Sequence, residues 1–238
     1  VEISELIKNR LTEIGINFLR KKYEHSGSIN HLIIDNLLPN KVASKLNFHF
    51  PREEELNHLN APQENKFVGV YFSDKQNLVQ ECLYAFQEQS ILKIIGQITN
   101  IKNLIGDPEL YAGGVSSMSK GCFLNPHIDN SHDRNLEKFR RLNLLYYVNK
   151  DWIPTEDGGQ LVLYPKGIKN KEEEIHCKFN RLVIMRTDNK SIHGVKKVLS
   201  KTKRRKCISN YYFSNNSPSD KKYYHSTSFR GFKKEFIK

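Results

Sequence analysis

The chain has 238 residues, which suits one large domain, and its 38% of hydrophobic residues fall in clear runs that can form a core. Its four cysteines are widely spaced without a C-x-x-C pair, which argues against a disulfide framework and favours the reducing cytoplasm. The net charge of +12 is dispersed without interleaved aromatic residues, and no apolar run has membrane length, so neither a nucleic-acid nor a membrane partner is expected.

The first hundred residues are predicted to support a sheet with helices. Apolar side chains recur at the spacing of an amphipathic helix in two long stretches, and strand-like runs lie between them. The predicted elements are helices at residues 3–22, 38–48 and 78–100, strands at 30–35 and 67–72, and a polar loop at 52–66. An isolated regulatory module is the alternative for these helices, but such stripes more often cover a sheet.

From about residue 111 the pattern changes to short strands separated by turn signals, among them Gly158-Gly159, which is interpreted as a hairpin turn. The expected strands are residues 123–129, 141–148, 160–164, 181–186, 195–198 and 205–214. Many short strands after helices predict a mainly β fold with helical support, either a barrel or a double-sheet jelly roll. Residues 1–112 then support a core at 113–215, and residues 216–238 wrap the outside or end loosely, all within a single domain.

The sequence His127-x-Asp129, followed much later by His193, contains the ligand set of a non-haem Fe(II) site with one open face. Residues two apart in a strand point to the same face, so His127 and Asp129 can share a cavity while the third ligand comes from a neighbouring strand. A bare H-x-D pair is a weak signal in a chain with nine histidines. The nearby pair His132-Asp133 lacks the spacing of two and is predicted to lie in a loop.

A basic residue, Arg205, follows the last of these ligands in the strand-like stretch RRKCISNYYFS. A guanidinium stays charged and pairs with a carboxylate through two hydrogen bonds. The metal triad, a spacer and a basic residue on a strand together indicate an iron enzyme that uses a 2-oxo acid. The adjacent Arg204 is expected to point the opposite way.

Residues 121–214 resemble the Fe(II)/2-oxoglutarate dioxygenases, specifically the prolyl 4-hydroxylase-like branch. The motifs that carry the resemblance are RRLNLLYYVNKDW, DGGQLVLYP, FNRLVIMRTD, IHGV and RRKCISNYYF, in the family's order. They are especially similar to those of the oxygen-sensing prolyl hydroxylases. The resemblance implies a double-stranded β-helix (jelly-roll) core and iron held by His127, Asp129 and His193.

The resemblance also implies roles for side chains around the metal. Arg205 is expected to pair with the distal carboxylate of 2-oxoglutarate, and the Tyr147 hydroxyl is expected to share that carboxylate. Near the substrate, the expected residues are Arg140, Asn143 and Tyr211. Two alternatives stay open: Tyr147 as an ordinary core tyrosine and Arg140 as a solvated charge.

One feature departs from the family pattern. The family commonly has a tyrosine about ten residues before the first histidine, where it reaches the cosubstrate. Here that region reads SSMSKGCF, with Ser117 and Met118, and Tyr111 lies too far upstream to replace it. Residues 73–77 and 223–232 are expected to form the walls of the entrance.

The implied activity is hydroxylation of an unactivated carbon by a catalytic domain that spans residues 1–238. It consumes O2 and 2-oxoglutarate, requires Fe(II), releases succinate and CO2, and is expected to use ascorbate as reductant. A prolyl residue of a protein or peptide is the favoured substrate, and a small molecule or carbohydrate is the alternative. A non-catalytic jelly-roll binding module is disfavoured because a structural metal site does not need Arg205, and a nucleic-acid demethylase is disfavoured because no base-stacking platform is evident.

Overall fold

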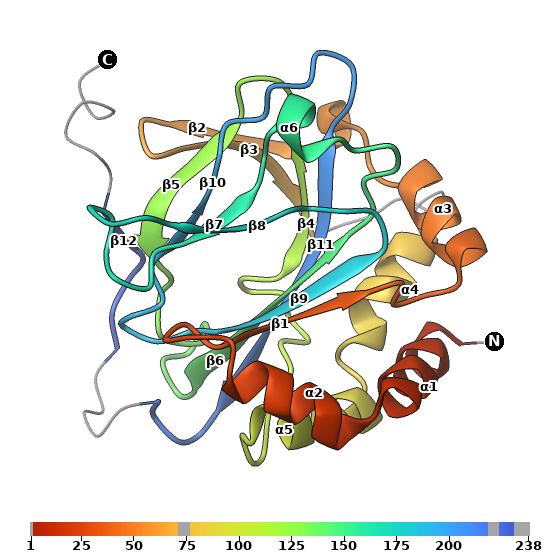
Figure 1. The fold of residues 1–238 in the computed structure, drawn as a ribbon, viewed down its shortest axis with the longest axis vertical. Coiled ribbons are helices and arrows are strands. Elements are labelled where there is room, and N and C mark those ends of the chain that lie inside the picture. The colour runs from red at the N-terminus through yellow and green to blue at the C-terminus, as the bar shows by residue number, and fades with distance from the viewer. Residues whose placement is uncertain (1, 71–76, 219–223, 231–238) are drawn as a thin grey trace.

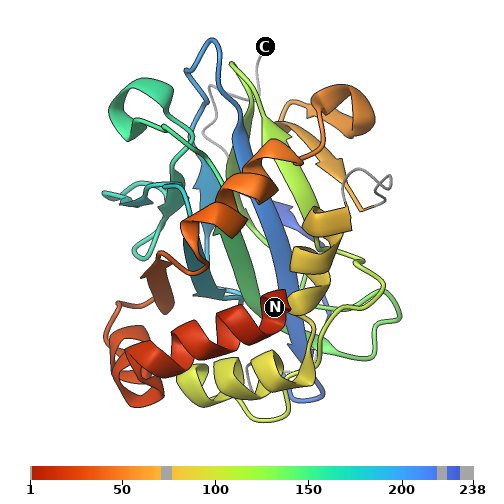
Figure 2. The same cartoon turned by 90° about the vertical axis from the view of Figure 1, so that its right-hand side faces the viewer.

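The computed structural model describes residues 2–70, 77–218 and 224–230. A continuous antiparallel sheet curls on itself, and helices cover one of its faces (Figures 1 and 2). The strand order along the sheet is β1-β9-β6-β11-β4-β3-β5-β10-β7-β8, with β12 paired to β5 and β2 paired to β3. The mainly β fold with helical support that the sequence predicts is therefore confirmed.

The helices lie in the first hundred residues, apart from one short helix after β6. Their bounds are α1 Ile3–Ile14, α2 Ile16–Glu24, α3 Asn40–Phe48, α4 Asn77–Ala85, α5 Gln89–Thr99 and α6 Pro154–Asp157. The predicted helix at 3–22 is in fact two helices, because Gly15 takes a φ of 98° that ends the first one. The predicted helix at 78–100 is also divided, and the carbonyl of Phe86 at the break accepts a hydrogen bond from the Tyr212 hydroxyl. None of the described helices has the length and apolar character needed to cross a bilayer.

The strands before the metal-binding motif contain the largest prediction error. Their bounds are β1 His31–Asp35, β2 Asn57–Ala61, β3 Glu64–Gly69, β4 Gly114–Met118 and β5 Phe123–Ile128. The segment 52–66 is not a loop, because a short 3-10 helix at Glu53–Glu55 leads into the hairpin β2–β3. All five residues of β2 are exposed, so the strand lacks the alternation of polar and apolar side chains that marks a half-buried strand. Residues 71 and 72 of the predicted strand at 67–72 lie outside the described residues.

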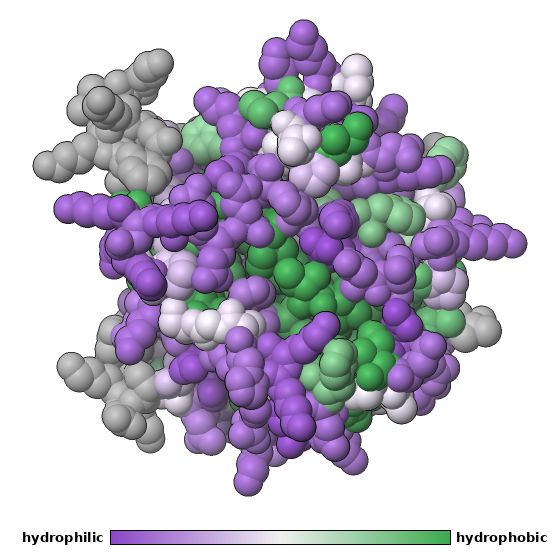
Figure 3. Space-filling view, in the orientation of Figure 1, coloured by the Kyte–Doolittle hydropathy of each residue, from purple (hydrophilic) through white to green (hydrophobic). Residues whose placement is uncertain are grey.

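The remaining strands complete the jelly roll. They are β6 Phe139–Tyr147, β7 Leu161–Leu163, β8 Glu173–Ile175, β9 Arg181–Arg186, β10 His193–Val195, β11 Arg205–Ser214 and β12 Ser228–Phe229. The strand predicted at 195–198 begins earlier, at His193, because this residue pairs with both β5 and β7. In Figure 3, hydrophilic side chains cover most of the visible face, and apolar side chains gather near its middle, over β8 and β9.

Alternation along β6 and β11 separates two apolar clusters and thereby positions the site. Leu144 and Tyr146 on β6, with Ile208 on β11, pack in the cluster that lies beneath the helices. The intervening residues face the inside of the jelly roll, where Tyr147 and Cys207 belong to a second cluster. Because side chains alternate across a strand, the odd-numbered residues from Asn143 to Tyr147 on β6 and from Arg205 to Tyr211 on β11 point into one interior space. A β-bulge beyond the pair Leu142–Tyr212 shifts this alternation, so Arg140 and not Arg141 lies on the interior side.

Candidate metal centre

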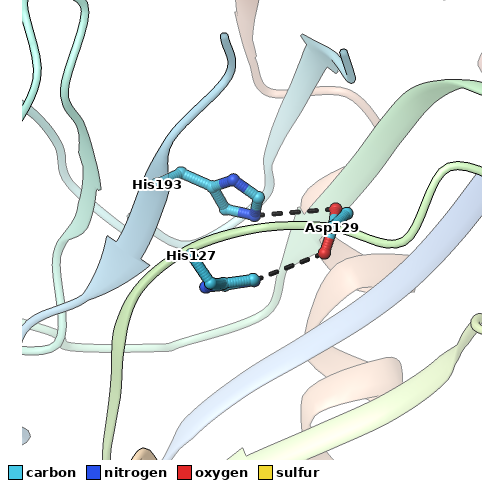
Figure 4. Close-up of side chains that lie close together, drawn as sticks. All are labelled: His127, Asp129 and His193. Atoms are coloured by element: carbon cyan, nitrogen blue, oxygen red, sulfur yellow. Dashed lines mark ion pairs between the residues drawn. The ribbon is translucent and has the colours of Figure 1, made fainter. Parts of the chain in front are cut away.

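The three predicted metal ligands converge at the pairing of β5 with β10. His193 lies opposite His127 in the register of these strands, and Asp129 directly follows the end of β5. One ligand atom from each residue lies within 4.8 Å of the other two. Figure 4 shows both imidazoles directed at the carboxylate, with Nε2–oxygen distances of 3.3 Å from His127 and 3.7 Å from His193.

Backbone carbonyls orient both imidazole rings. Nδ1 of His127 lies 2.9 Å from the carbonyl of Asn125, and Nδ1 of His193 lies 2.9 Å from the carbonyl of Ser191. A carbonyl accepts but cannot donate, so each Nδ1 carries a proton, and in the neutral form of each ring Nε2 has the free lone pair. Both rings therefore present to Asp129 the nitrogen that can bind a metal.

Burial sets the protonation states of the cluster. Burial, with a smaller effect of the nearby His127, lowers the pKa of His193 to about 4, so its imidazole is neutral at neutral pH. Burial opposes ionisation of Asp129 most strongly, yet the histidines and Arg140 hold the pKa of this carboxyl well below its usual range. A neutral imidazole and an ionised carboxylate are the forms that coordinate a divalent metal. The donor set therefore fits Fe(II).

The nearby pair His132-Asp133 stabilises a turn, as the sequence predicts. The Asp133 carboxylate accepts hydrogen bonds from the backbone N–H groups of Glu137 and Lys138, at 2.8 and 3.0 Å. Nδ1 of His132 bonds to a backbone carbonyl at 2.6 Å. These contacts are local, and neither His132 nor Asp133 belongs to the metal-binding group of His127, Asp129 and His193.

Arg205 lies inside the jelly roll at a cavity of about 340 Å³ that the metal triad also lines. Its side chain is almost fully buried, and Nη2 donates to the Tyr147 hydroxyl at 3.1 Å. Burial raises the pKa of Tyr147, so its hydroxyl keeps a proton that it can donate onward to a carboxylate. Arg204 points outward, 4.0 Å from Glu54. The cavity thus combines a metal-binding triad with a cationic anchor.

Gly159 allows Arg205 to reach this position, a role that the sequence did not reveal. The pair Gly158-Gly159 is not a hairpin turn, because it follows α6 and Gly158 forms an isolated bridge with Val198. Nε of Arg205 donates to the carbonyl of Gly159 at 2.8 Å. A Cβ atom at Gly159 would lie 3.0 Å from Cδ of Arg205, closer than ordinary van der Waals contact.

Replacing Gly159 by alanine is expected to displace Arg205 and to strain the backbone, whose φ there is +67°. We expect a loss of about 1–2 kcal/mol in the free energy of unfolding. If Arg205 binds the distal carboxylate of 2-oxoglutarate, the KM for 2-oxoglutarate should also rise about tenfold, which corresponds to about 1.4 kcal/mol. Gly167→Ala is the matched control, because Gly167 has a φ of +82° but no atom within 4 Å of the position that an alanine methyl group would take. Equal effects of the two substitutions on KM would contradict the role of Gly159.

The region without the family tyrosine contributes a thioether to the cavity wall. Sδ of Met118 lies 3.6 Å from Nη1 of Arg205, while Ser117 turns away and donates to Glu53 at 3.1 Å. Tyr111 does line the cavity despite its distance in sequence, but its hydroxyl accepts a hydrogen bond from Asn130 at 3.2 Å. In this region of the described chain, the side chain that lies beside Arg205 is therefore Met118 and not a tyrosine.

The three residues expected near the substrate divide into two groups. Asn143 and Tyr211 line the large cavity and are joined by a hydrogen bond of 3.3 Å. Arg140 lies behind them, with its guanidinium 4.0 Å above the Tyr211 ring and Nη1 3.6 Å from Oδ2 of Asp129. Arg140 is 4% exposed, so the alternative of a solvated charge is wrong.

The described part of the tail is fixed to the strand that carries His127. β12 pairs with β5, placing Phe229 opposite His127 with ring centroids 5.4 Å apart. The N–H of Arg230 donates to the carbonyl of Pro126 at 2.6 Å. Residues 224–230 therefore lie beside the metal cluster, whereas residues 71–76, 219–223 and 231–238 lie outside the described residues, including most of the expected entrance wall at 73–77.

Sequence comparison identifies the module that contains this site. Residues 113–213 match the family model described as the 2OG-Fe(II) oxygenase superfamily. That match covers less than half of the chain. The chain is also 30% identical over 112 residues to human Egl nine homolog 1, across 47% of this chain and 24% of that protein. It spans no more than about a quarter of the length of the curated relatives that it matches.

Solved structures share the fold. A prolyl hydroxylase from Trichoplax adhaerens, in complex with a hypoxia-inducible-factor peptide fragment, aligns with a TM-score of 0.58 at 20% identity. That alignment covers 87% of this chain and 90% of the other. A prolyl 4-hydroxylase from Pseudomonas putida aligns with a TM-score of 0.61 at 17% identity, covering 82% and 98%. The predicted jelly-roll core and the likeness to prolyl hydroxylases are confirmed.

Proposed function

We propose that this chain is an Fe(II)- and 2-oxoglutarate-dependent oxygenase and that its described residues act as one catalytic domain. The observation that carries the proposal is the shared cavity, which has the triad His127, Asp129 and His193 on its wall and Arg205 inside it. A structural metal site needs no buried cation beside it, so a non-catalytic binding module does not account for Arg205.

Different residues of the cavity would bind the metal, the cosubstrate and the substrate. When bound, Fe(II) with 2-oxoglutarate and O2 supplies the oxidation of an unactivated C–H bond, with succinate and CO2 as coproducts. Arg205 and Tyr147 would hold the distal carboxylate of the cosubstrate, the first through its charge and the second through its hydroxyl proton. Apolar side chains form part of the wall of the same cavity; they are Leu124, Leu145, Leu161 and Val195. Asn143 and Tyr211 would face the substrate side.

We infer that the substrate is a prolyl residue of a protein or peptide, hydroxylated at C4. The named relatives and structural neighbours support this choice, because prolyl hydroxylases recur among them and one is bound to a peptide. The exposed hairpin β2–β3 also contributes Asn57, Leu59 and Lys66 to the cavity lining, which gives an extended chain a surface to follow. A small molecule or carbohydrate is the alternative substrate.

Two further assignments belong to this proposal. Ascorbate would serve as the reductant that keeps the iron ferrous. The four cysteines are buried and unpaired, which suits the reducing cytoplasm. A nucleic-acid partner is not part of this proposal, because the positive charge of the chain is dispersed.

The substrate assignment is tested by incubating the protein with Fe(II), 2-oxoglutarate, ascorbate and a library of proline-containing peptides. Mass spectrometry should detect a gain of about 16 Da on proline, as expected for one hydroxyl group, and succinate in equal amount. The same mixture with Arg205→Met protein is the control. Hydroxylation of metabolites in a parallel incubation, with unmodified peptides, would select the alternative substrate class. Absence of succinate from every mixture would contradict the oxygenase activity itself.

A further inference from the structure

Arg140 lies on the side of Asp129 that faces away from the large cavity. Among the described residues, Asn143 and Tyr211 line that cavity, but Arg140 does not. It lines instead a smaller cavity, together with Asp129, Ser131 and other polar residues. A substrate in the large cavity would therefore meet Asn143 and Tyr211, whereas the carboxylate of Asp129 is within direct reach of Arg140.

The carboxylate and the guanidinium each have a buried atom that needs a partner. Oδ2 of Asp129 and Nε of Arg140 are buried and form no hydrogen bond with any described residue. A buried charged group without a partner is strongly disfavoured, so the contact of 3.6 Å between Nη1 and Oδ2 compensates both residues. Among the described residues, Arg140 is the arginine or lysine within ion-pair distance of Asp129.

Strand pairing fixes the guanidinium in place. Its central carbon lies 4.0 Å from the centroid of the Tyr211 ring, a cation–π contact. Tyr211 is held in turn by Asn143, which is its partner in the register of β6 with β11 and donates a hydrogen bond to its hydroxyl. Asn143 thus holds Tyr211, Tyr211 holds the guanidinium of Arg140, and that guanidinium lies beside Asp129. The pairing of β6 with β11 therefore sets the position of the cation.

We propose that Arg140 is a positioning residue that orients Asp129 for metal binding, an inference that rests on the proposed iron site. The guanidinium attracts Oδ2, which also lies 3.7 Å from Nε2 of His193, while Oδ1 lies 3.3 Å from Nε2 of His127. Arg140 thereby fixes the rotation of the whole carboxylate between the two imidazoles. The carboxylate is then held in its binding orientation before a metal arrives. Loss of such an outer partner typically weakens metal affinity about 10–100-fold.

The test is a titration with Mn(II), a redox-inert divalent metal, at one fixed pH without substrate or cosubstrate. Arg140→Met should raise the Kd for Mn(II) at least about tenfold, and Arg140→Lys should recover part of the affinity because it restores the charge. Arg141→Met is the matched control. Arg141 is the next residue of β6, faces the other side and donates to Ser214, so its replacement should leave the Kd within about twofold of wild type.

A role in substrate binding alone predicts a different result. It would leave the Kd for Mn(II) of Arg140→Met unchanged while the KM for substrate rises, and that outcome, or tighter Mn(II) binding, overturns the inference. If wild-type protein binds no Mn(II), the proposed iron site fails and the inference fails with it. Thermal unfolding shows whether each variant folds, and Arg140→Gln replaces Arg140→Met if the latter does not.

Discussion

Replacing Asp129 by alanine is expected to weaken Mn(II) binding by more than about 100-fold and to abolish 2-oxoglutarate turnover. The reason is that Asp129 contributes the one anionic ligand of the cluster, whereas loss of a mere outer partner already costs about 10–100-fold. Isothermal titration with Mn(II) measures the first effect, and succinate release measures the second. Asp129→Asn should show the same loss with a side chain of nearly the same shape, which separates the missing charge from the missing volume.

Asp133→Ala is the control for this prediction. Asp133 lies four residues away and caps a turn through backbone N–H groups, so its loss should lower stability by about 1 kcal/mol without changing metal affinity. Retention of wild-type Mn(II) affinity by Asp129→Ala would remove this residue from the metal site.

Replacing Arg205 by methionine is expected to raise the KM for 2-oxoglutarate about 100-fold while Mn(II) binding is retained. Methionine fills much of the same space but cannot pair with a carboxylate. The hydrogen bonds of a guanidinium with a carboxylate contribute about 1.5–3 kcal/mol each, and about 2.8 kcal/mol corresponds to 100-fold. Initial rates of succinate release at increasing 2-oxoglutarate measure the KM, and a Mn(II) titration checks the metal site.

Arg204→Met provides the matched control, because Arg204 is adjacent in sequence but directed away from the cavity. It should leave the KM unchanged. A KM for 2-oxoglutarate that is the same in Arg205→Met as in wild type would show that the cosubstrate is anchored elsewhere.

The parts of the site that follow strand periodicity could be predicted from the sequence. The spacing of two between His127 and Asp129 identified residues directed toward one cavity. Alternation predicted that Arg204 and Arg205 point opposite ways, and the resemblance to the family strand selected Arg205. Tyr147 was predicted beside Arg205 through resemblance, and the structure places the two in hydrogen-bond contact. These relations depend on local backbone geometry or on ordered motifs, which the sequence displays directly.

The parts that depend on contacts between distant segments could not be predicted. Gly159 was interpreted as a turn residue because nothing local shows that the side chain of Arg205 passes against it. Arg140 was expected at the substrate, but a β-bulge between the pairs Leu142–Tyr212 and Arg140–Phe213 shifts the alternation of β6, and the side chain of Arg140 lies beside Asp129. The exposed strand β2 has no apolar face, and the pairing of β12 with β5 joins the end of the described chain to its middle.

The most direct test of the iron and cosubstrate site is a pair of calorimetric titrations on the wild-type chain, first with Mn(II) and then with 2-oxoglutarate. The shared cavity predicts one Mn(II) per chain, followed by one 2-oxoglutarate whose affinity is markedly higher with the metal than without it. Absence of stoichiometric Mn(II) binding, or 2-oxoglutarate binding that is indifferent to the metal, would contradict the assignment.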